Sequence, residues 1–245
     1  MQRIAAYSVQ AGVTTLSLTC CLLLLLLLPP ATAKAQTVDD TGLWFAAFGN
    51  GKLETPHDCD SRLRWWFDTH YRMADDTGGF SQSILRPGLG IALNDEQVVW
   101  AGYAWIRSSP IVGQDFDEHR FWQQWTATPS TDQWKFLHRS RFEQRWVETG
   151  DEVGLRWRQL ARAQRILTDC PQWSLVVWDE VFLNLNNTDW GATAGLDQNR
   201  AFLGLGYKRH PDATVRTEVG YLNQFINRQG GIDGMNHILS INFFY

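Results

Sequence analysis

Beyond residue 35, the sequence lacks any continuous apolar stretch long enough for a membrane-spanning helix. Residence in a membrane would therefore depend on strands in which apolar and polar residues alternate. The chain also lacks an excess of positive charge, because 26 Asp and Glu outnumber 22 Lys and Arg. The formal net charge of -4 excludes an overall basic nucleic-acid-binding protein.

Cysteines are few, and two of the four, Cys20 and Cys21, lie in an N-terminal leucine-rich segment. The other two, Cys59 and Cys170, belong to the part of the chain that we expect to be exported, where disulfides are permitted. Both lie beside the ends of predicted strands. They are equally compatible with a disulfide near the periplasmic rim and with two free thiols.

Residues 1–35 have the organisation of a secretory signal peptide. Arg3 supplies the positive end, residues 16–28 form the apolar core, and small residues around Ala33 and Ala35 offer a cleavage site. A transmembrane anchor is the alternative, but the apolar run is shorter than the roughly 18 residues that a span needs, and two prolines follow it. We predict cleavage after Ala35, which leaves residues 36–245 as one domain.

The last eleven residues, 235–245, alternate with a period of two. His237, Leu239, Ile241, Phe243 and Tyr245 share one face. A segment of about ten residues that ends the chain on an aromatic side chain is typical of the closing strand of a bacterial outer-membrane β-barrel. This pattern predicts residence in the outer membrane of a Gram-negative bacterium, with the strand ending at Tyr245 as the part that the barrel assembly machinery binds.

Alternation and turn residues predict an all-β fold, a transmembrane antiparallel up-and-down barrel of about ten strands, with twelve as the alternative. The predicted strands lie near residues 59–72, 79–93, 97–107, 118–127, 133–147, 152–164, 172–184, 198–208, 213–226 and 234–245. The connections alternate between long ones, at 108–117, 185–197 and 227–233, and short ones, at 94–96, 128–132 and 209–212.

Residues 42–49 also have the pattern of a strand, and this strand would be the eleventh. Bacterial single-chain barrels have an even number of strands. We therefore predict that these residues form an N-terminal cap, an insert in the lumen, or half of a strand pair.

Charged residues gather on one face of several predicted strands. Arginine on the lipid side near the bilayer midplane costs about 2 to 4 kcal/mol, so the arginine-bearing faces must point into the lumen. The predicted lumenal charge network consists of Arg139, Arg141, Glu143, Arg145, Arg156, Arg158, Glu180, Arg200, Arg216 and Glu218.

A tight turn centred on residues 149–150 would place Glu143 opposite Arg156 and Arg141 opposite Arg158. The like-charged pair then needs an anion, water, or a carboxylate from across the lumen, for which Glu180 and Glu218 are candidates. An alternative interpretation is that the charges form a solvated ion-pair network that fills a narrow barrel.

Several motifs together resemble a known family. They are Arg139-x-Arg141-x-Glu143-x-Arg145, Arg156-x-Arg158, Asn199-Arg200 with Gly204-x-Gly206-Tyr207, Glu218-x-Gly220-Tyr221-Leu222-Asn223-Gln224, and Asn236-His237 before the aromatic end. They are similar to those of the bacterial family catalogued as domain of unknown function 2490. The resemblance implies an outer-membrane β-barrel without an assigned activity, and it carries over no catalytic residues.

Three classes of function remain open. The first is a narrow passive channel or solute-binding barrel that favours small anions, because guanidinium groups suit carboxylate and phosphate. The second is an outer-membrane lipid hydrolase that uses His138 and Ser140 on the lipid face, with Gln159 opposite Ser140. The third is a structural or surface-interaction barrel that works through its long loops. The expected partners are outer-membrane lipids and small anionic solutes, with no nucleic acid, and no motif indicates a cofactor or a metal site.

Overall fold

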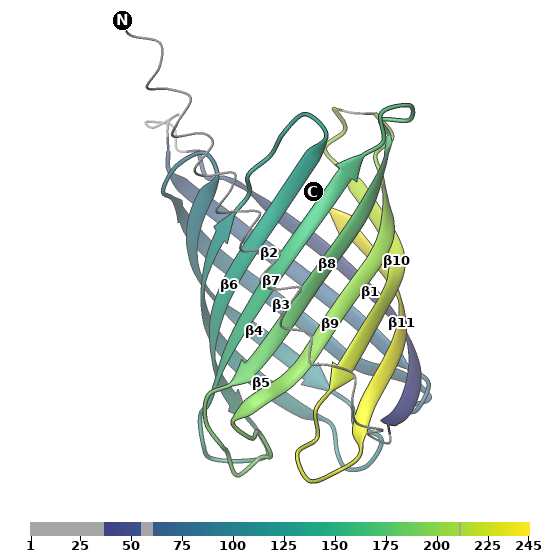
Figure 1. Cartoon of the computed structure of the whole chain (residues 1–245). Coiled ribbons are helices and arrows are strands. Elements are labelled where there is room, and N and C mark those ends of the chain that lie inside the picture. The colour runs from purple at the N-terminus through teal and green to yellow at the C-terminus, as the bar shows by residue number, and fades with distance from the viewer. Residues whose placement is uncertain (1–36, 55–60, 211) are drawn as a thin grey trace, which may run out of the picture. The chain divides into compact units, whose positions relative to one another are not determined.

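The computed structural model describes residues 37–54, 61–210 and 212–245, which form a closed β-barrel (Figure 1). Within these residues no helix is long and apolar enough to cross a membrane. The eleven strands are β1 (Thr37–Lys52), β2 (Leu63–Ala74), β3 (Gly79–Ala92), β4 (Gln97–Ser108), β5 (Phe116–Ala127), β6 (Trp134–Val147), β7 (Gly154–Ile166), β8 (Trp173–Asn184), β9 (Gly195–Tyr207), β10 (Arg216–Ile226) and β11 (Asp233–Phe244).

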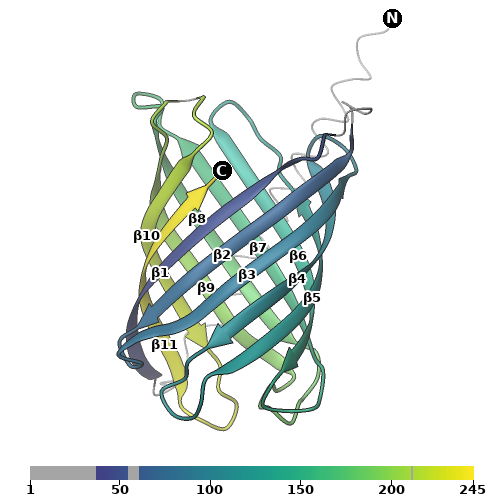
Figure 2. The ribbon, with the colours of Figure 1, turned by 180° about the vertical axis from the view of Figure 1, so that it is seen from behind.

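The barrel closes through a parallel pair of strands. Each strand from β2 to β11 pairs antiparallel with its neighbour in the sequence, and β1 pairs antiparallel with β2. On its other edge β1 runs parallel to β11, with Thr37 opposite Asp233 and Phe48 opposite Phe244. Figure 2 shows the purple β1 beside β2, with the yellow β11 on its other side.

The predicted all-β barrel is confirmed, but the predicted number of ten or twelve strands is wrong. Residues 42–49 belong to β1 and form part of the wall, so they are neither a cap, an insert nor half of an extra pair. Strands β2 and β11 run in opposite directions and would close a ten-stranded barrel by themselves. A single strand inserted between them can be antiparallel to only one of the two, so its other edge must be parallel.

The ten predicted strands match β2 to β11 to within four residues at each end. The connections 75–78, 109–115, 148–153, 185–194 and 227–232 lie at one end of the barrel, which we call the loop rim. The connections 93–96, 128–133 and 167–172 lie at the other end with the end of β11, and we call this end the C-terminal rim. The three predicted long connections are at the loop rim, the predicted short ones at 94–96 and 128–132 are at the C-terminal rim, and the one at 209–212 contains residue 211, outside the described residues.

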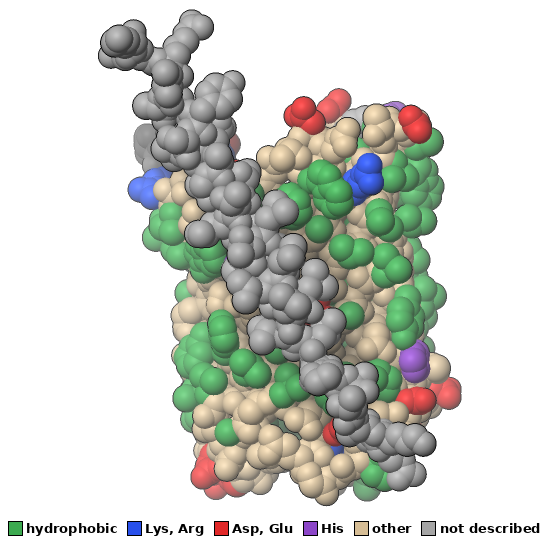
Figure 3. Space-filling view, in the orientation of Figure 1, with side chains coloured by type: hydrophobic (Ala, Val, Ile, Leu, Met, Phe, Trp, Pro, Cys, Tyr) green, Lys and Arg blue, Asp and Glu red, His purple; other side chains and the backbone are tan. Residues whose placement is uncertain are grey.

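The barrel has a polar interior and an apolar outer surface. Among the described residues, more polar and charged side chains than hydrophobic ones are buried. Large hydrophobic side chains such as Leu89, Leu203 and Leu205 are exposed on the outside. In Figure 3, hydrophobic side chains cover much of the visible wall, and charged side chains gather mainly at its two ends. This distribution is the reverse of that in a water-soluble domain.

Two hydrophobic clusters occupy part of the interior. Ile84, Trp100, Ala104, Ile106 and Trp122 form the cluster on the β3–β5 wall. Val176, Phe202, Leu222 and Ile238 form the cluster on the β8–β11 wall, and Trp44 of β1 packs against it. The charged side chains fill much of the interior beside these two clusters.

Candidate functional site

The candidate site is the charged interior of the barrel, and the pairing of β6 with β7 sets its geometry. Glu143 lies opposite Arg156 and Arg141 lies opposite Arg158, which is the register that the tight turn predicts. Because side chains alternate along a strand, Arg139, Arg141 and Glu143 all point inward and are buried.

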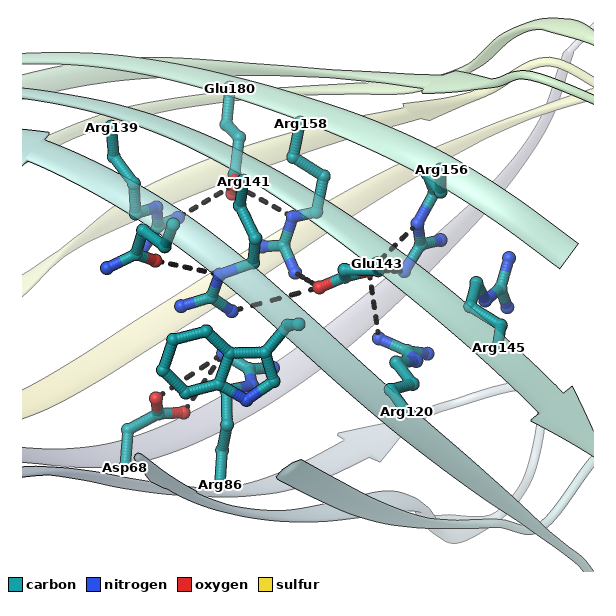
Figure 4. A network of polar contacts seen from close by, with 12 residues as sticks. Asp68, Arg86, Arg120, Arg139, Arg141, Glu143, Arg145, Arg156, Arg158 and Glu180 are labelled. Carbon is teal, nitrogen blue, oxygen red and sulfur yellow. Dashed lines mark hydrogen bonds and ion pairs between the residues drawn. The ribbon is translucent and has the colours of Figure 1, made fainter. Parts of the chain in front are cut away.

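Glu143 is the centre of the network and has no exposed surface. Its carboxylate accepts hydrogen bonds from Nη2 of Arg156 at 2.8 Å and from Nη1 of Arg158 at 2.7 Å. Nη1 of Arg120 and Nη1 of Arg141 lie farther away, at 3.6 and 3.8 Å. Figure 4 shows these four guanidinium groups arranged around one carboxylate. Four positively charged groups therefore lie within 4.0 Å of one carboxylate.

Glu180 is the second centre, and it lies on β8. Its Oε1 accepts hydrogen bonds from Nη2 of Arg139 at 2.7 Å and from Nη2 of Arg158 at 2.8 Å. Glu180, one of the two carboxylates predicted for this role, thus reduces the repulsion between Arg141 and Arg158 by pairing with Arg158. The other, Glu218, instead pairs with Arg162 and Arg216.

Arg141 is held differently. Its Nε donates to Oε1 of Gln124 at 2.8 Å, and its Cζ lies 4.7 Å from the centre of the Trp122 ring. Its two terminal nitrogens are buried and hydrogen-bond to none of the described residues. Buried donors without a partner are energetically costly, so this part of the interior favours an additional acceptor.

Several members of the network were not predicted from the sequence. These are Glu118, which binds Arg120 and Arg145, Asp197, which binds Arg156, and Arg86, which binds Asp68. The alternation of Glu118, Arg120, Trp122 and Gln124 along β5 was the signal that could have located the first of these groups. It was weak because the outer face of the same strand also carries polar residues, among them His119 and Gln123.

The interior carries an excess of positive charge. Counted over the described residues between the rims, eleven arginines face six carboxylates, so that 11 - 6 leaves five unbalanced positive charges. The arginines are Arg72, Arg86, Arg120, Arg139, Arg141, Arg145, Arg156, Arg158, Arg162, Arg200 and Arg216, and the carboxylates are Asp68, Glu118, Glu143, Glu180, Asp197 and Glu218. Nearer the rims, three basic residues (Arg64, Lys135, Arg228) balance three acidic residues (Asp40, Asp76, Asp95) along the same cavity.

The side chains do not fill the interior completely. A cavity of about 1240 Å³ remains. It is lined by Thr77 and Trp190 at the loop rim and by Asp95 and Ser130 at the C-terminal rim. This volume exceeds that of ordinary small-molecule pockets, which measure about 300 to 1,000 Å³.

The residues predicted for a lipid hydrolase, His138, Ser140 and Gln159, do not assemble as a catalytic group. Ser140 lies opposite Gln159, as predicted. The side-chain nitrogen of Gln159 contacts Nε2 of His138 at 2.6 Å, whereas Oγ of Ser140 accepts a hydrogen bond from Nε1 of Trp157 at 2.8 Å. No hydrogen bond joins Ser140 to His138 in the described structure. A serine without a base in hydrogen-bond contact is not activated as a nucleophile.

The remaining predicted site residues are the cysteines. Cys59 lies outside the described residues, so the possible disulfide with Cys170 stays a prediction. Cys170 is exposed in the connection 167–172. Within the described ranges, no group of three or more His, Cys, Asp and Glu side chains could hold a metal ion.

Comparisons with known proteins identify a family without assigning an activity. A family model described as protein of unknown function (DUF2490) matches residues 41–236. An uncharacterized protein of Methylorubrum extorquens is 35% identical over 217 residues, which cover 87% of this chain and 91% of that protein. No solved structure matches the chain. The protein therefore belongs to the DUF2490 family.

Proposed function

We propose that the protein is an outer-membrane β-barrel that acts as a narrow passive channel for small anions. The first support is the outer surface. A tilted membrane strand needs about 9 to 11 residues, and the strands here contain 11 to 16. Their outward-facing side chains are largely apolar. A bilayer is the environment that such a surface favours.

Aromatic side chains near the ends of the strands give a second support. On the loop-rim side, exposed aromatic residues include Tyr71, Trp146 and Trp157. On the C-terminal side they include Trp134, Trp173, Tyr207, Phe243 and Tyr245. Two girdles of amphipathic rings flank the apolar band of outer-membrane barrels, where they lie at the level of the lipid headgroups.

The observation that carries the anion preference is the charge of the interior. Five unbalanced positive charges surround one cavity whose lining reaches both rims. A positive potential in a narrow, low-dielectric passage concentrates anions and repels cations. Guanidinium groups in addition bind carboxylate and phosphate oxygens through two parallel hydrogen bonds.

The test is the conductance of the purified barrel in a planar bilayer under a salt gradient. We expect discrete channels whose reversal potential shows a preference for chloride over potassium. Arg216→Gln removes one positive charge that lines the cavity and should therefore reduce this preference. Glu218 is not left unpaired in this variant, because it keeps Arg162 as its partner. Arg165→Gln, an arginine of the outer face, is the matched control and should leave the preference unchanged.

Two results would overturn the proposal. The first is a barrel that reconstitutes but does not conduct, which would indicate a filled structural barrel. The second is a preference for cations. Recovery of the protein outside the outer-membrane fraction, or as a folded monomer that needs no detergent, would refute the membrane assignment itself.

A further inference from the structure

Two of the buried arginines form no ion pair with a described carboxylate, although Glu180 lies opposite one of them, Arg200, in the β8–β9 register. Eight arginines are buried in the described part of the barrel, namely Arg72, Arg86, Arg120, Arg139, Arg141, Arg156, Arg158 and Arg200. Six of them form ion pairs. Arg72 and Arg200 form none with any described residue, although both line the cavity.

These two arginines meet at one aromatic side chain. The Cζ atom of Arg72 lies 3.9 Å from the centre of the Trp44 ring, and that of Arg200 lies 5.0 Å from it. Arg200 also lies over Phe182, at 4.6 Å. Trp44 comes from β1, which is the strand that the sequence pattern did not place in the wall. The parallel strand thus contributes the platform around which the two arginines gather.

Neutral amides fix the orientation of both guanidinium groups. Nη1 of Arg72 donates to Oε1 of Gln82 at 2.7 Å, and Nε of Arg200 donates to Oε1 of Gln198 at 3.1 Å. Nε of Arg72 is buried and has no hydrogen-bond partner in the described part of the chain. The terminal nitrogens of Arg200 hydrogen-bond to no described residue. Donors therefore remain available on both side chains.

The aromatic ring and the amides hold the two cations without neutralising them. Cation–π contacts and hydrogen bonds to amide oxygens stabilise a guanidinium group but leave its full positive charge. Two like charges on one indole inside a barrel repel each other, and an anion that contacts both would remove this repulsion. The planar fork of each guanidinium suits an oxyanion with two or more oxygens.

We propose that Arg72 and Arg200, held around Trp44, form a binding site for the oxyanion group of a small solute, a carboxylate or a phosphate. This inference rests on the proposed anion channel and adds to it the class of solute and the place where the solute binds. Binding at this site does not itself require conduction. The two ideas can therefore fail separately.

The experiment is calorimetric titration of the full-length protein in detergent with inorganic phosphate, acetate and chloride at constant ionic strength. We expect one saturable site for phosphate or acetate, and at least a tenfold loss of affinity in Arg72→Gln/Arg200→Gln. The matched control is Arg165→Gln/Arg209→Gln, which removes the same total charge from two exposed arginines that do not line the cavity. Its affinity should equal that of the unmodified protein.

Two further variants protect the test against a folding defect. Trp44→Phe keeps an aromatic ring under the arginines and should retain binding. Arg72→Lys/Arg200→Lys keeps both charges but loses the forks, so its affinity should fall. Heat-modifiable migration on gels reports whether each variant is folded.

The outcomes are distinct. Saturable binding of phosphate alone assigns a phosphorylated solute, and binding of acetate as well assigns carboxylates. Equal loss in the two glutamine double variants would overturn the site, because it would show that total charge alone attracts the anions. Absence of saturable binding by either oxyanion would overturn it as well. Saturable binding by a protein that does not conduct would refute the channel and leave the site standing.

Discussion

Arg158 joins two carboxylates that lie on different strands. It donates from Nη1 to Glu143 at 2.7 Å and from Nη2 to Glu180 at 2.8 Å. Glu143 lies on β6, Arg158 on β7 and Glu180 on β8, so one guanidinium group ties three neighbouring strands together inside the barrel. Such a bridge is strong only if water is largely excluded from it.

The first prediction concerns Glu143→Gln. This change removes the carboxylate nearest to Arg141 and one of the two carboxylates that Arg120, Arg156 and Arg158 each contact. Breaking a buried pair on one side costs about 3 to 5 kcal/mol. We expect the barrel to unfold at lower denaturant concentration by a corresponding amount. Equilibrium unfolding in detergent measures this loss, and Glu96→Gln, in the turn 93–96, serves as a control for the exchange of carboxylate for amide.

The alternative outcome is also informative. If water fills the passage around Glu143, screening should reduce the loss to about 0 to 1 kcal/mol. The variant would then mainly show a greater anion preference in conductance. No change in either stability or ion preference would contradict the role that we assign to Glu143.

A second prediction tests how closely the interior is packed. An added Cβ at Gly102 would lie 2.4 Å from the carbonyl oxygen of Pro87 and 2.4 Å from the ring of Trp122. Overpacking of this kind costs about 1 to 3 kcal/mol, so Gly102→Ala should destabilise the barrel. At Gly231 the nearest atoms would be 3.5 Å away. Gly231→Ala should therefore unfold at the denaturant concentration of the unmodified protein.

A third prediction concerns the end of the chain. The backbone nitrogen of Tyr245 donates to the carbonyl oxygen of Phe48 at 2.8 Å, and the Phe48 and Phe244 rings stack with centroids 4.9 Å apart. Deleting Tyr245 removes a contact of the closing pair and the terminal aromatic residue. The yield of heat-modifiable barrel should fall more than after deletion of Gly230, which lies in a connection at the loop rim. Equal yields would show that Tyr245 has no special part in closure.

A fourth prediction concerns pH. Burial and the neighbouring Asp40 carboxylate raise the pKa of Asp76, in the turn 75–78, above its ordinary value of 3.8. As the pH falls through this raised pKa, Asp76 loses its negative charge while Arg228 and the other cavity arginines stay charged. Anion preference should therefore increase on acidification from neutral pH. Asp76→Asn should already show the higher preference at neutral pH, and reversal potentials of the two proteins that stay apart in acid would contradict this assignment.

A fifth prediction concerns lipid hydrolysis. Because Ser140 contacts Trp157 and His138 contacts Gln159, we expect no release of fatty acid from phospholipid in mixed micelles above the background of Ser140→Ala. Release that disappears in Ser140→Ala, with folding intact, would restore the hydrolase hypothesis.

The sequence predicted strands and faces well because both are local properties. Alternation located β2 to β11, and the short turn between β6 and β7 sufficed to set the register that brings Glu143 to Arg156. It did not predict the partner of β1. Alternation shows which face of a strand is apolar, but it carries no information about which distant strand lies alongside.

Many of the ion pairs could not be predicted from the sequence for a related reason. Arg139 on β6 meets Glu180 on β8, 41 residues along the chain, and Arg162 on β7 meets Glu218 on β10, 56 residues along the chain. Whether a lumenal arginine finds a carboxylate depends on strand tilt and side-chain reach. That Arg72 and Arg200 form no ion pair with a described residue is therefore visible only in three dimensions.

The parallel seam between β1 and β11 has a consequence for how the chain folds. All other strand pairs join neighbours in the sequence and can form in order as each hairpin is completed. The seam joins positions such as Thr37 and Asp233, for which 233 - 37 gives a separation of 196 residues. The entropy lost in closing this long loop is offset only when β11 has formed and can pair with β1. Until then the first strand presents a free edge, so the slowest step of folding should be the meeting of the two ends of the chain.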